Sequence, residues 1–392
     1  MFAVFPATRK LLARLFLPLA ALALAACEPI PGGLNSGASI NTSKPVPVAL
    51  LVPAGSGNST NDILAQSLEN AARLAMRDLN GVQIDLRVYP TAADAGTAAA
   101  AAEQAVDDGA KIILGPVFAG PANAVGVAVA DDNVNVLAFS NNAAIAGGNV
   151  FILGQTFQNT ANRMTAFARA QGKSRFVIVH GQDSAGNQGR AAVQSAVTAQ
   201  GATVAGNVSY ALSQQDVIAS IPTIRDTVQS TGADAIFMTT DTATALPLLS
   251  QLLPEAGVSS ATAQFIGLTR WDIPPQTLSL PGVQGGWFAV PDPGAASLFS
   301  GQYQSAYGST PHPIGGLAFD GIAAIGALVS QGKSDALTRS ALTQGAGYRG
   351  ASGVFRLMPD GTNQRGLAVA TITDAQVQIL SPAPQNFGGA GF

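Results

Sequence analysis

The chain has 392 residues, of which 47% are hydrophobic and only 11% are charged, and its formal net charge is −3. This length is sufficient for two domains, and the apolar composition excludes a disordered chain. Because no cluster of Lys and Arg forms a phosphate-binding stripe, we expect no nucleic acid among its partners.

The first 26 residues have the pattern of a secretory signal peptide. Positive charge comes from Arg9, Lys10 and Arg14, and the apolar run "LFLPLAALALAA" follows. The run ends in Leu24-Ala25-Ala26-Cys27, which contains the only cysteine of the chain. Small residues before a cysteine resemble a bacterial lipobox, in which the thiol is acylated and becomes the new N-terminus. A plain secretory signal with an incidental cysteine is the alternative.

Acylation of Cys27 would anchor the protein to a membrane facing the periplasm. The next residue is Glu28 and not the Asp of the inner-membrane retention rule, which favours the outer membrane. Residues 27–45 are rich in Pro, Gly, Ser and Asn and are predicted to form the lipidated cysteine and a flexible tether. With no second cysteine, the chain has no disulfide framework and no cysteine zinc site.

From Val46 onward, strand and helix patterns alternate. The strand "VPVALLVPAG" precedes the amphipathic helix "DILAQSLENAARLAMRDLN", and "VQIDLRVYP" precedes the Ala-rich helix "AGTAAAAAEQAVDDG". The strand "AKIILGP", the small-residue helix "PANAVGVAVADDN" and the strand "VNVLAFS" follow. Strand, helix and strand in this order predict right-handed parallel units with helices on both faces of a sheet.

The pattern restarts at "NVFILGQTF". Helices are predicted near 159–171, 186–200, 216–230 and 243–253, between the strands "RFVIVHG", "TVAGNVSYAL", "DAIFMTTD" and "QFIGLTRW". The later chain is less regular, with a strand "GGWFAVP", helices near 295–307 and 315–330, and a tail of antiparallel strands. We therefore predict an α/β protein with two lobes, built on parallel sheets, that share chain crossovers.

This order of elements resembles the type I periplasmic binding proteins, in particular the Leu/Ile/Val-binding subfamily. The segments "ALLVPAGSG", "RFVIVHGQDSAGNQG" and "YRGASGVFRLMPDGT" are similar to its lobe openings and its late glycine-rich segment, and the similarity covers 46–380. The resemblance implies two Rossmann-like lobes joined by a hinge. It divides the chain into a first lobe of 46–155 plus 290–347, a second lobe of 156–289 plus 348–382, and a disordered tail of 383–392.

The resemblance also implies a function without catalysis. A lipid-anchored member would capture a small polar or amino-acid-like solute between its lobes for ABC-type uptake, with an ABC permease as partner. A lipoprotein of this fold is also similar to the penicillin-binding-protein activators, whose partner is a peptidoglycan synthase, and this alternative stays open. No matched nucleophile, base and oxyanion donors accompany either function, and the two histidines are far apart in sequence, so we expect no enzyme, cofactor or metal.

Ligands of such a fold lie where the carboxyl ends of the strands of both lobes face each other. The residues expected there on the first lobe are Ser56, Phe118, Ala119, Gly120, Ser140, Asn141 and Asn142. Those expected on the second lobe are His180, Asp183, Thr240, Asp241, Thr269 and Trp271. A structural interpretation of Ser140-Asn141-Asn142, as caps of the following turn, is the alternative.

The amino-acid clamp of the subfamily is not reproduced at these positions. The resemblance places its ligand-holding hydroxyls at Ala119 and Asn142 and its acidic residue near Thr269. An α-ammonium group would therefore have no carboxylate partner unless Asp241 or Asp272 served, and a buried unpaired charge is costly. Arg270 is a candidate either for a ligand anion or for a salt bridge within the protein.

Overall fold

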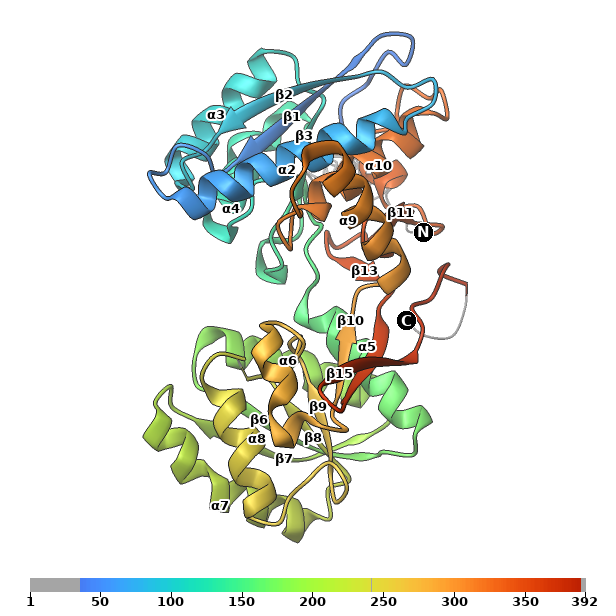
Figure 1. Cartoon of the computed structure of the whole chain (residues 1–392). Coiled ribbons are helices and arrows are strands. Elements are labelled where there is room, and N and C mark those ends of the chain that lie inside the picture. The colour runs from blue at the N-terminus through green and yellow to red at the C-terminus, as the bar shows by residue number, and fades with distance from the viewer. Residues whose placement is uncertain (1–35, 241, 389–392) are drawn as a thin grey trace, which may run out of the picture.

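The computed structural model describes residues 36–240 and 242–388, which form two α/β lobes joined by a narrow waist (Figure 1). The predicted signal peptide, Cys27 and Asp241 lie outside the described residues. Within the described ranges, no helix is both long enough and apolar enough to span a membrane.

The first lobe contains a parallel sheet of five strands in the order β2-β1-β3-β4-β5. Its strands are β1 (Val46–Val52), β2 (Ile84–Pro90), β3 (Ile112–Leu114), β4 (Asn135–Ala138) and β5 (Val150–Ile152). The strands are almost fully buried apart from the edge strand β2, as expected for a parallel sheet covered on both faces.

Helices cover both faces of this sheet. One face carries α2 (Ser59–Arg77) and α10 (Gly316–Val329), and the other carries α3 (Ala95–Asp107) and α4 (Ala119–Ala128). Small residues let these helices approach closely, since a Cβ on Gly126 of α4 would lie 2.3 Å from Cγ2 of Val150. The lobe is completed by α9 (Pro293–Tyr307), α11 (Arg339–Leu342) and the 3-10 turns η1 (Ala130–Asp132) and η2 (Ala143–Ile145).

The second lobe contains a sheet of seven strands in the order β15-β14-β10-β9-β8-β6-β7. Its strands are β6 (Arg175–Gly181), β7 (Thr203–Tyr210), β8 (Ala235–Met238), β9 (Gln264–Gly267), β10 (Trp287–Val290), β14 (Ala368–Thr373) and β15 (Gln376–Ser381). The strands β6 to β10 pair in parallel, whereas β14 and β15 are antiparallel, as the sequence predicted for the tail.

This sheet too has a helix layer on each face. One core cluster includes side chains of α5 (Phe157–Ala170) and α6 (Ser184–Ala199), and the other includes those of α7 (Gln214–Thr231) and α8 (Ala245–Glu255). The 3-10 turns η3 (Pro275–Ser279) and η4 (Pro281–Val283) follow β9. The predicted fold class, two α/β lobes with parallel sheets, is confirmed.

A third, smaller sheet belongs with the first lobe. Its antiparallel strands are β11 (Tyr348–Gly350), β12 (Gly353–Leu357) and β13 (Asn363–Arg365). Tyr348, Phe355 and Leu357 are buried in the first-lobe core. The sequence prediction assigned all of 348–382 to the second lobe, whereas these apolar side chains hold 348–365 on the first and the chain crosses only at 366–367.

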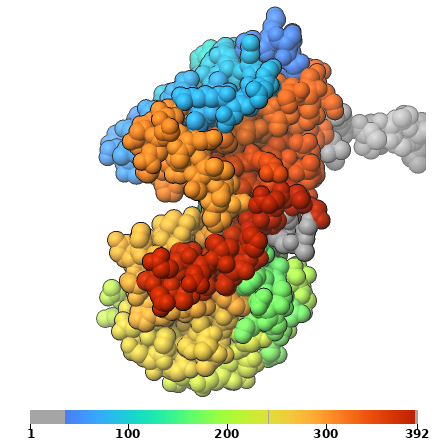
Figure 2. All heavy atoms as spheres, turned by 45° about the vertical axis from the view of Figure 1, so that its right-hand side comes forward, coloured from blue at the N-terminus to red at the C-terminus, as the bar shows by residue number. Residues whose placement is uncertain are grey.

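The described part of the predicted disordered tail makes defined contacts. Ala383 is buried, Nε2 of Gln385 donates to Oδ2 of Asp292 at 2.6 Å, and the Arg356 guanidinium lies 4.6 Å from the centre of the Phe387 ring. The C-terminal segment, red in Figure 2, runs over the second lobe to the waist. The contact between Gln385 and Asp292 therefore ties the C-terminal segment to the crossover near Asp292.

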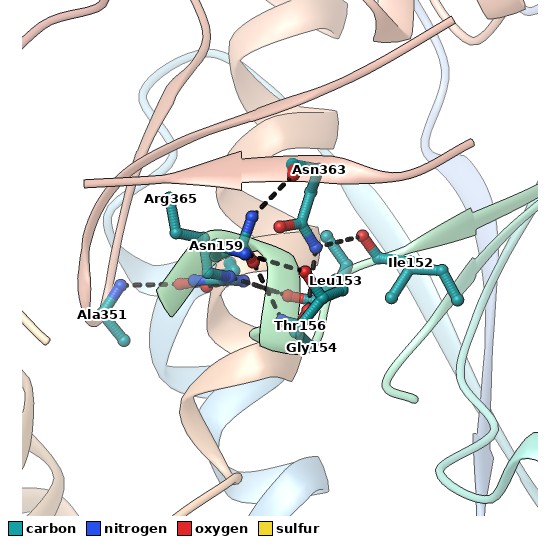
Figure 3. A network of polar contacts seen from close by, with 9 residues as sticks. Ile152, Leu153, Gly154, Thr156, Asn159, Ala351, Asn363 and Arg365 are labelled. Carbon is teal, nitrogen blue, oxygen red and sulfur yellow. Dashed lines mark hydrogen bonds and ion pairs between the residues drawn. The ribbon is translucent and has the colours of Figure 1, made fainter. Parts of the chain in front are cut away.

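A buried ion pair lies at the waist, where the chain passes between the lobes at 153–156, 291–292 and 366–367. Arg365 of β13 pairs with Asp320 of α10 at 2.8 Å, and their side chains are 5% and 0% exposed. Nε of Arg365 also donates to the carbonyl oxygen of Leu153 at 2.9 Å, and Oδ1 of Asp320 accepts the Ala351 N–H at 2.7 Å. Figure 3 shows these contacts from close by.

Asn363, on the same strand, extends this network to the second lobe. Its Nδ2 donates to the carbonyls of Ile152 and Gly154, at 2.7 and 2.8 Å (Figure 3). Its own carbonyl accepts Nδ2 of Asn159, which forms a capping box with Thr156 at the start of α5. The first crossover is thereby held at its carbonyls and at the helix that follows.

Arg163 of α5 fastens the crossover at 366–367. Its Nε donates to the Leu367 carbonyl at 2.7 Å and its Nη2 donates to Oγ of Ser381 at 2.7 Å. Burial lowers the pKa of this guanidinium. The waist thus contains two buried arginines, of which only Arg365 pairs with a carboxylate among the described residues.

The ion pair at the waist is sensitive to the loss of either partner. Burial raises the pKa of the Asp320 carboxyl, against the opposing effects of the Arg365 charge and the Ala351 N–H. Removing one partner leaves the other charge buried without compensation.

We expect Asp320→Asn to lower the free energy of unfolding by about 3–5 kcal/mol, because Arg365 keeps its charge in a buried site. The double variant Asp320→Asn/Arg365→Met should recover most of this loss, since no buried charge remains. Arg225→Met, in an exposed pair with Asp226, is the control and should change stability by less than about 1 kcal/mol. Urea unfolding followed by circular dichroism measures all three, and an Asp320→Asn value equal to the control would contradict the role of the pair.

Candidate functional site

A cavity of about 760 Å³ lies between the lobes, at the carboxyl ends of the first-lobe strands. The first lobe supplies Val117, Phe118, Ala119, Phe139, Ser140, Asn141, Asn142, Pro313, Ile314, Gly316 and Leu317. The second lobe supplies Phe157, Ser184, Ala185, Gln188, Arg270 and Ile273, and the waist supplies Gly154, Gln155, Pro291, Ser352, Arg365 and Leu367. The position agrees with the rule that ligands of open α/β sheets bind beyond the strand carboxyl ends.

Ser140-Asn141-Asn142 both lines this cavity and caps a turn. Oγ of Ser140 accepts the Asn142 N–H at 3.1 Å, and Oδ1 of Asn142 accepts the Ala144 N–H at 3.0 Å, at the start of η2. The two interpretations of this stretch are therefore compatible. The side-chain oxygen of Asn142 serves the backbone, which leaves its Nδ2 group as a donor for a bound molecule.

Two helices begin at the cavity, one from each lobe. The N-cap of α4, Phe118, makes no side-chain cap hydrogen bond, so the N–H groups of Ala119 and Gly120 have no acceptor within the helix. In α6, Oδ1 of Asp183 accepts only the Gly186 N–H, and Ser184 and Ala185 line the cavity. Both helix ends direct partial positive charge toward the cleft.

Arg270 and Asp272 form an ion pair at the edge of the cavity. Nε of Arg270 donates to Oδ1 of Asp272 at 2.9 Å, and Nη2 contacts Oδ2. The Arg270 side chain is 37% exposed and that of Asp272 is 15% exposed. Asp272 therefore has a cationic partner within the protein.

The lining contains arginines but no acid. Among the described residues, its ionisable side chains are Arg270 and Arg365, and no Asp, Glu, Lys, His or Cys takes part. A group of three or more potential metal ligands is also absent from residues 36–240 and 242–388. The lining offers hydroxyl and amide groups, such as those of Ser140, Asn142 and Gln188, that can hydrogen-bond to a bound molecule.

The structure brings part of the predicted site together. Phe118, Ala119, Ser140, Asn141 and Asn142 line the cavity. Asp183 contributes indirectly, as the N-cap that positions Ser184 and Ala185.

Five other described residues of the predicted site, Ser56, Gly120, His180, Thr240 and Thr269, are not part of the lining. Oγ of Ser56 accepts from the Asn58 N–H and from Asn61, and Gly120 lies within α4. His180 is buried with Nδ1 2.9 Å from its neighbour's carbonyl, and the Thr269 hydroxyl donates to the Thr240 carbonyl at 3.0 Å. The side chains of His180 and Thr269 thus contact backbone carbonyls of the second lobe.

Trp271, expected at the cleft, is part of the second-lobe core. It is 0% exposed and stacks near Phe288, with ring centres 6.3 Å apart. Its ring fits against Gly267 and Gly286, where an added Cβ would come within 2.5 and 2.3 Å of it. Trp271 is absent from the cavity lining because Gly267 at the end of β9 and Gly286 just before β10 make room for its ring inside the lobe.

Sequence reasoning also missed several apolar lining residues. Phe139, Phe157, and the pair Ile314 and Leu317 reach the cavity from three separate segments. Only Ser184 and Ala185 had a local signal, since they directly follow the N-cap Asp183.

Comparisons with known proteins agree with this geometry. The chain matches a family model described as periplasmic binding protein over residues 45–376, whereas no curated protein matches it in sequence. A putative branched-chain amino acid ABC transporter from Rhodospirillum rubrum has a similar structure, with 18% identity, a TM-score of 0.73 and coverage of 86% of this chain and 100% of that chain.

Two further solved structures were determined with ligands. An ABC transporter substrate-binding protein from Desulfitobacterium hafniense, in complex with Leu, matches at 18% identity and a TM-score of 0.63, covering 86% of this chain and 100% of that chain. A solute-binding protein from R. palustris, in complex with benzoate, matches at 16% identity and a TM-score of 0.56. The match covers 89% of this chain and 99% of that chain. At these identities the comparisons show a shared fold.

We expect Trp271→Ala to lower the free energy of unfolding by about 3–5 kcal/mol, because it opens a cavity in the second-lobe core. Leu298→Ala, at a side chain that is 71% exposed, should stay within about 0.5 kcal/mol of the parent. Chemical denaturation of both variants decides the point. A Trp271 variant as stable as the Leu298 variant would place the ring outside the core.

Proposed function

The chain belongs to the periplasmic binding protein family, and on that premise we propose that it captures a small molecule between its lobes for an ABC-type permease. The observation that carries the proposal is the cavity of about 760 Å³, lined from both lobes and from the waist. A cavity of this volume is in the range of small-ligand sites.

The division of the lining between lobes supports capture by closure. A molecule that contacts Phe118 on one lobe and Ser184 on the other gains contacts as the lobes approach. It would therefore favour a closed form over an open one, because a ligand shifts an equilibrium by its differential affinity for the two states.

Attachment to a membrane through Cys27 is part of the proposal. The described chain begins on the first lobe, where the Ser36 carbonyl accepts the Arg339 N–H at 2.8 Å and the Ile40 N–H donates to Ser334 at 2.9 Å. Nδ2 of Asn135, the first residue of β4, also donates to the Ser36 carbonyl. Ser36 therefore lies at the amino end of the first-lobe strands, which is the side of the sheet opposite the cleft. An anchor here, at the outer membrane if Glu28 directs sorting, would leave the cleft free.

A second candidate is a penicillin-binding-protein activator of the same fold. The ion pair between Arg270 and Asp272 favours it, because it occupies the acid that could have received the ammonium group of an amino acid. A protein that had lost amino-acid binding could retain its lobes as a docking scaffold for a cell-wall synthase.

Thermal-shift screening of the chain without residues 1–27 tests the two candidates. The panel contains amino acids, small organic acids, short peptides and muropeptides. A ligand at 100 times its Kd stabilises the folded state by about 2.7 kcal/mol and should raise Tm by several degrees. No shift with any compound, together with co-purification of a penicillin-binding protein, would contradict uptake.

We expect Asn142→Ala to weaken binding of any compound found in that screen by about 2- to 10-fold, since an amide donor in the cavity is lost. Asn61→Ala is the matched control, because Asn61 bonds to Ser56 away from the cavity. Isothermal titration calorimetry measures both variants. Equal affinities for the two would move the ligand site elsewhere.

A further inference from the structure

The charges around the cavity indicate what kind of molecule it accepts. From them we infer that the ligand is a carboxylate with an apolar or aromatic body and without an α-ammonium group. The inference rests on the proposed function, because it takes the interlobe cavity as the ligand site.

The described carboxylates beside the lining are already neutralised by the protein. Asp272 pairs with Arg270, and Asp320 pairs with Arg365. An ammonium group enclosed in the cavity would lose its hydration and find, among the described lining residues, only partial charges on hydroxyls and carbonyls. Burying such an uncompensated cation is strongly unfavourable, so the site discriminates against amino acids.

Arg270 has donors left for an anion. Its bonds to Asp272 use Nε and Nη2, and a guanidinium has five N–H donors. Its side chain lines the cavity and is more exposed than that of Asp272. A ligand carboxylate on the open side of Arg270 would gain a charge-assisted hydrogen bond.

The helix ends add donors from both lobes. The N–H groups of Ala119, at the start of α4, and of Ser184 and Ala185, at the start of α6, lie at the lining. A carboxylate can accept from either set, because helix N-termini carry partial positive charge. Together with the remaining N–H donors of Arg270, whose charge Asp272 balances, they give the cavity hydrogen-bond donors for an anion and no acid in its described lining.

Apolar side chains form a large part of the rest of the lining, beside amides and hydroxyls such as those of Asn142, Gln188 and Ser352. Phe118, Phe139, Phe157, Ile273, Ile314 and Leu317 contribute ring faces and branched side chains from both lobes. These groups suit a ring or a branched alkyl chain, whose burial supplies most of the affinity of a small ligand. A carboxylate at one end and a hydrocarbon body are therefore both accommodated.

Isothermal titration calorimetry with two matched pairs of compounds tests this inference on the mature chain. The pairs are 3-phenylpropanoate with L-phenylalanine, and 4-methylpentanoate with L-leucine, whose members differ only in the α-ammonium group. We expect the amine-free acid to bind at least about tenfold more tightly in one or both pairs. The amide 3-phenylpropanamide, which lacks the anion, should bind at least about tenfold more weakly than 3-phenylpropanoate.

Variants of the ion pair provide a second test. Arg270→Met removes the cation and exposes Asp272, so the preference for 3-phenylpropanoate over L-phenylalanine should fall at least about tenfold. Asp272→Asn keeps the cation and should preserve or increase this preference. Arg225→Met, in a remote exposed pair on α7, is the matched control and should leave the preference unchanged.

The outcomes separate this inference from the proposed function. Tighter binding of either amino acid, or loss of amino-acid binding in Asp272→Asn, overturns the inference and leaves a solute receptor in place. If neither pair binds, the inference fails, and the broader thermal-shift panel decides whether the protein is a receptor at all.

Discussion

The structure depends on the buried contact between Arg365 and Asp320, because it is placed where the chain passes between the lobes. The crossing segments have little regular structure of their own. Arg365 and Asn363 hold the carbonyls of Ile152, Leu153 and Gly154, so one short strand fixes the first crossing. Gly154 and Arg365 also line the cavity, so the contacts of the waist determine the geometry of this part of its wall.

Much of the fold could be predicted from the sequence because its signals are local. The alternating apolar strands and the helices between them were recognisable from periodicity and from glycine and asparagine stops. The same punctuation located Phe118 and Ser140-Asn141-Asn142 at strand exits, and these residues do line the cavity.

The rest depended on contacts between distant segments. Ile314, Ser352 and Arg365 reach the cavity from the last third of the chain, where no local pattern distinguishes a lining residue from a core residue. The position of Trp271 was missed for a similar reason. Its burial requires Gly267 at the end of β9 and Gly286 just before β10, and the pairing of β9 with β10 brings these glycines together.

The double role of Arg365 limits how this cleft can evolve. Its guanidinium lines the ligand cavity and also bonds to Leu153 and Asp320, so a substitution that altered ligand preference there would weaken the waist as well. Phe118 and Ile273 are 40% and 43% exposed and can vary at a smaller structural cost. Homologues that acquire new ligands should therefore diversify at the mobile walls of the cleft and keep its floor constant.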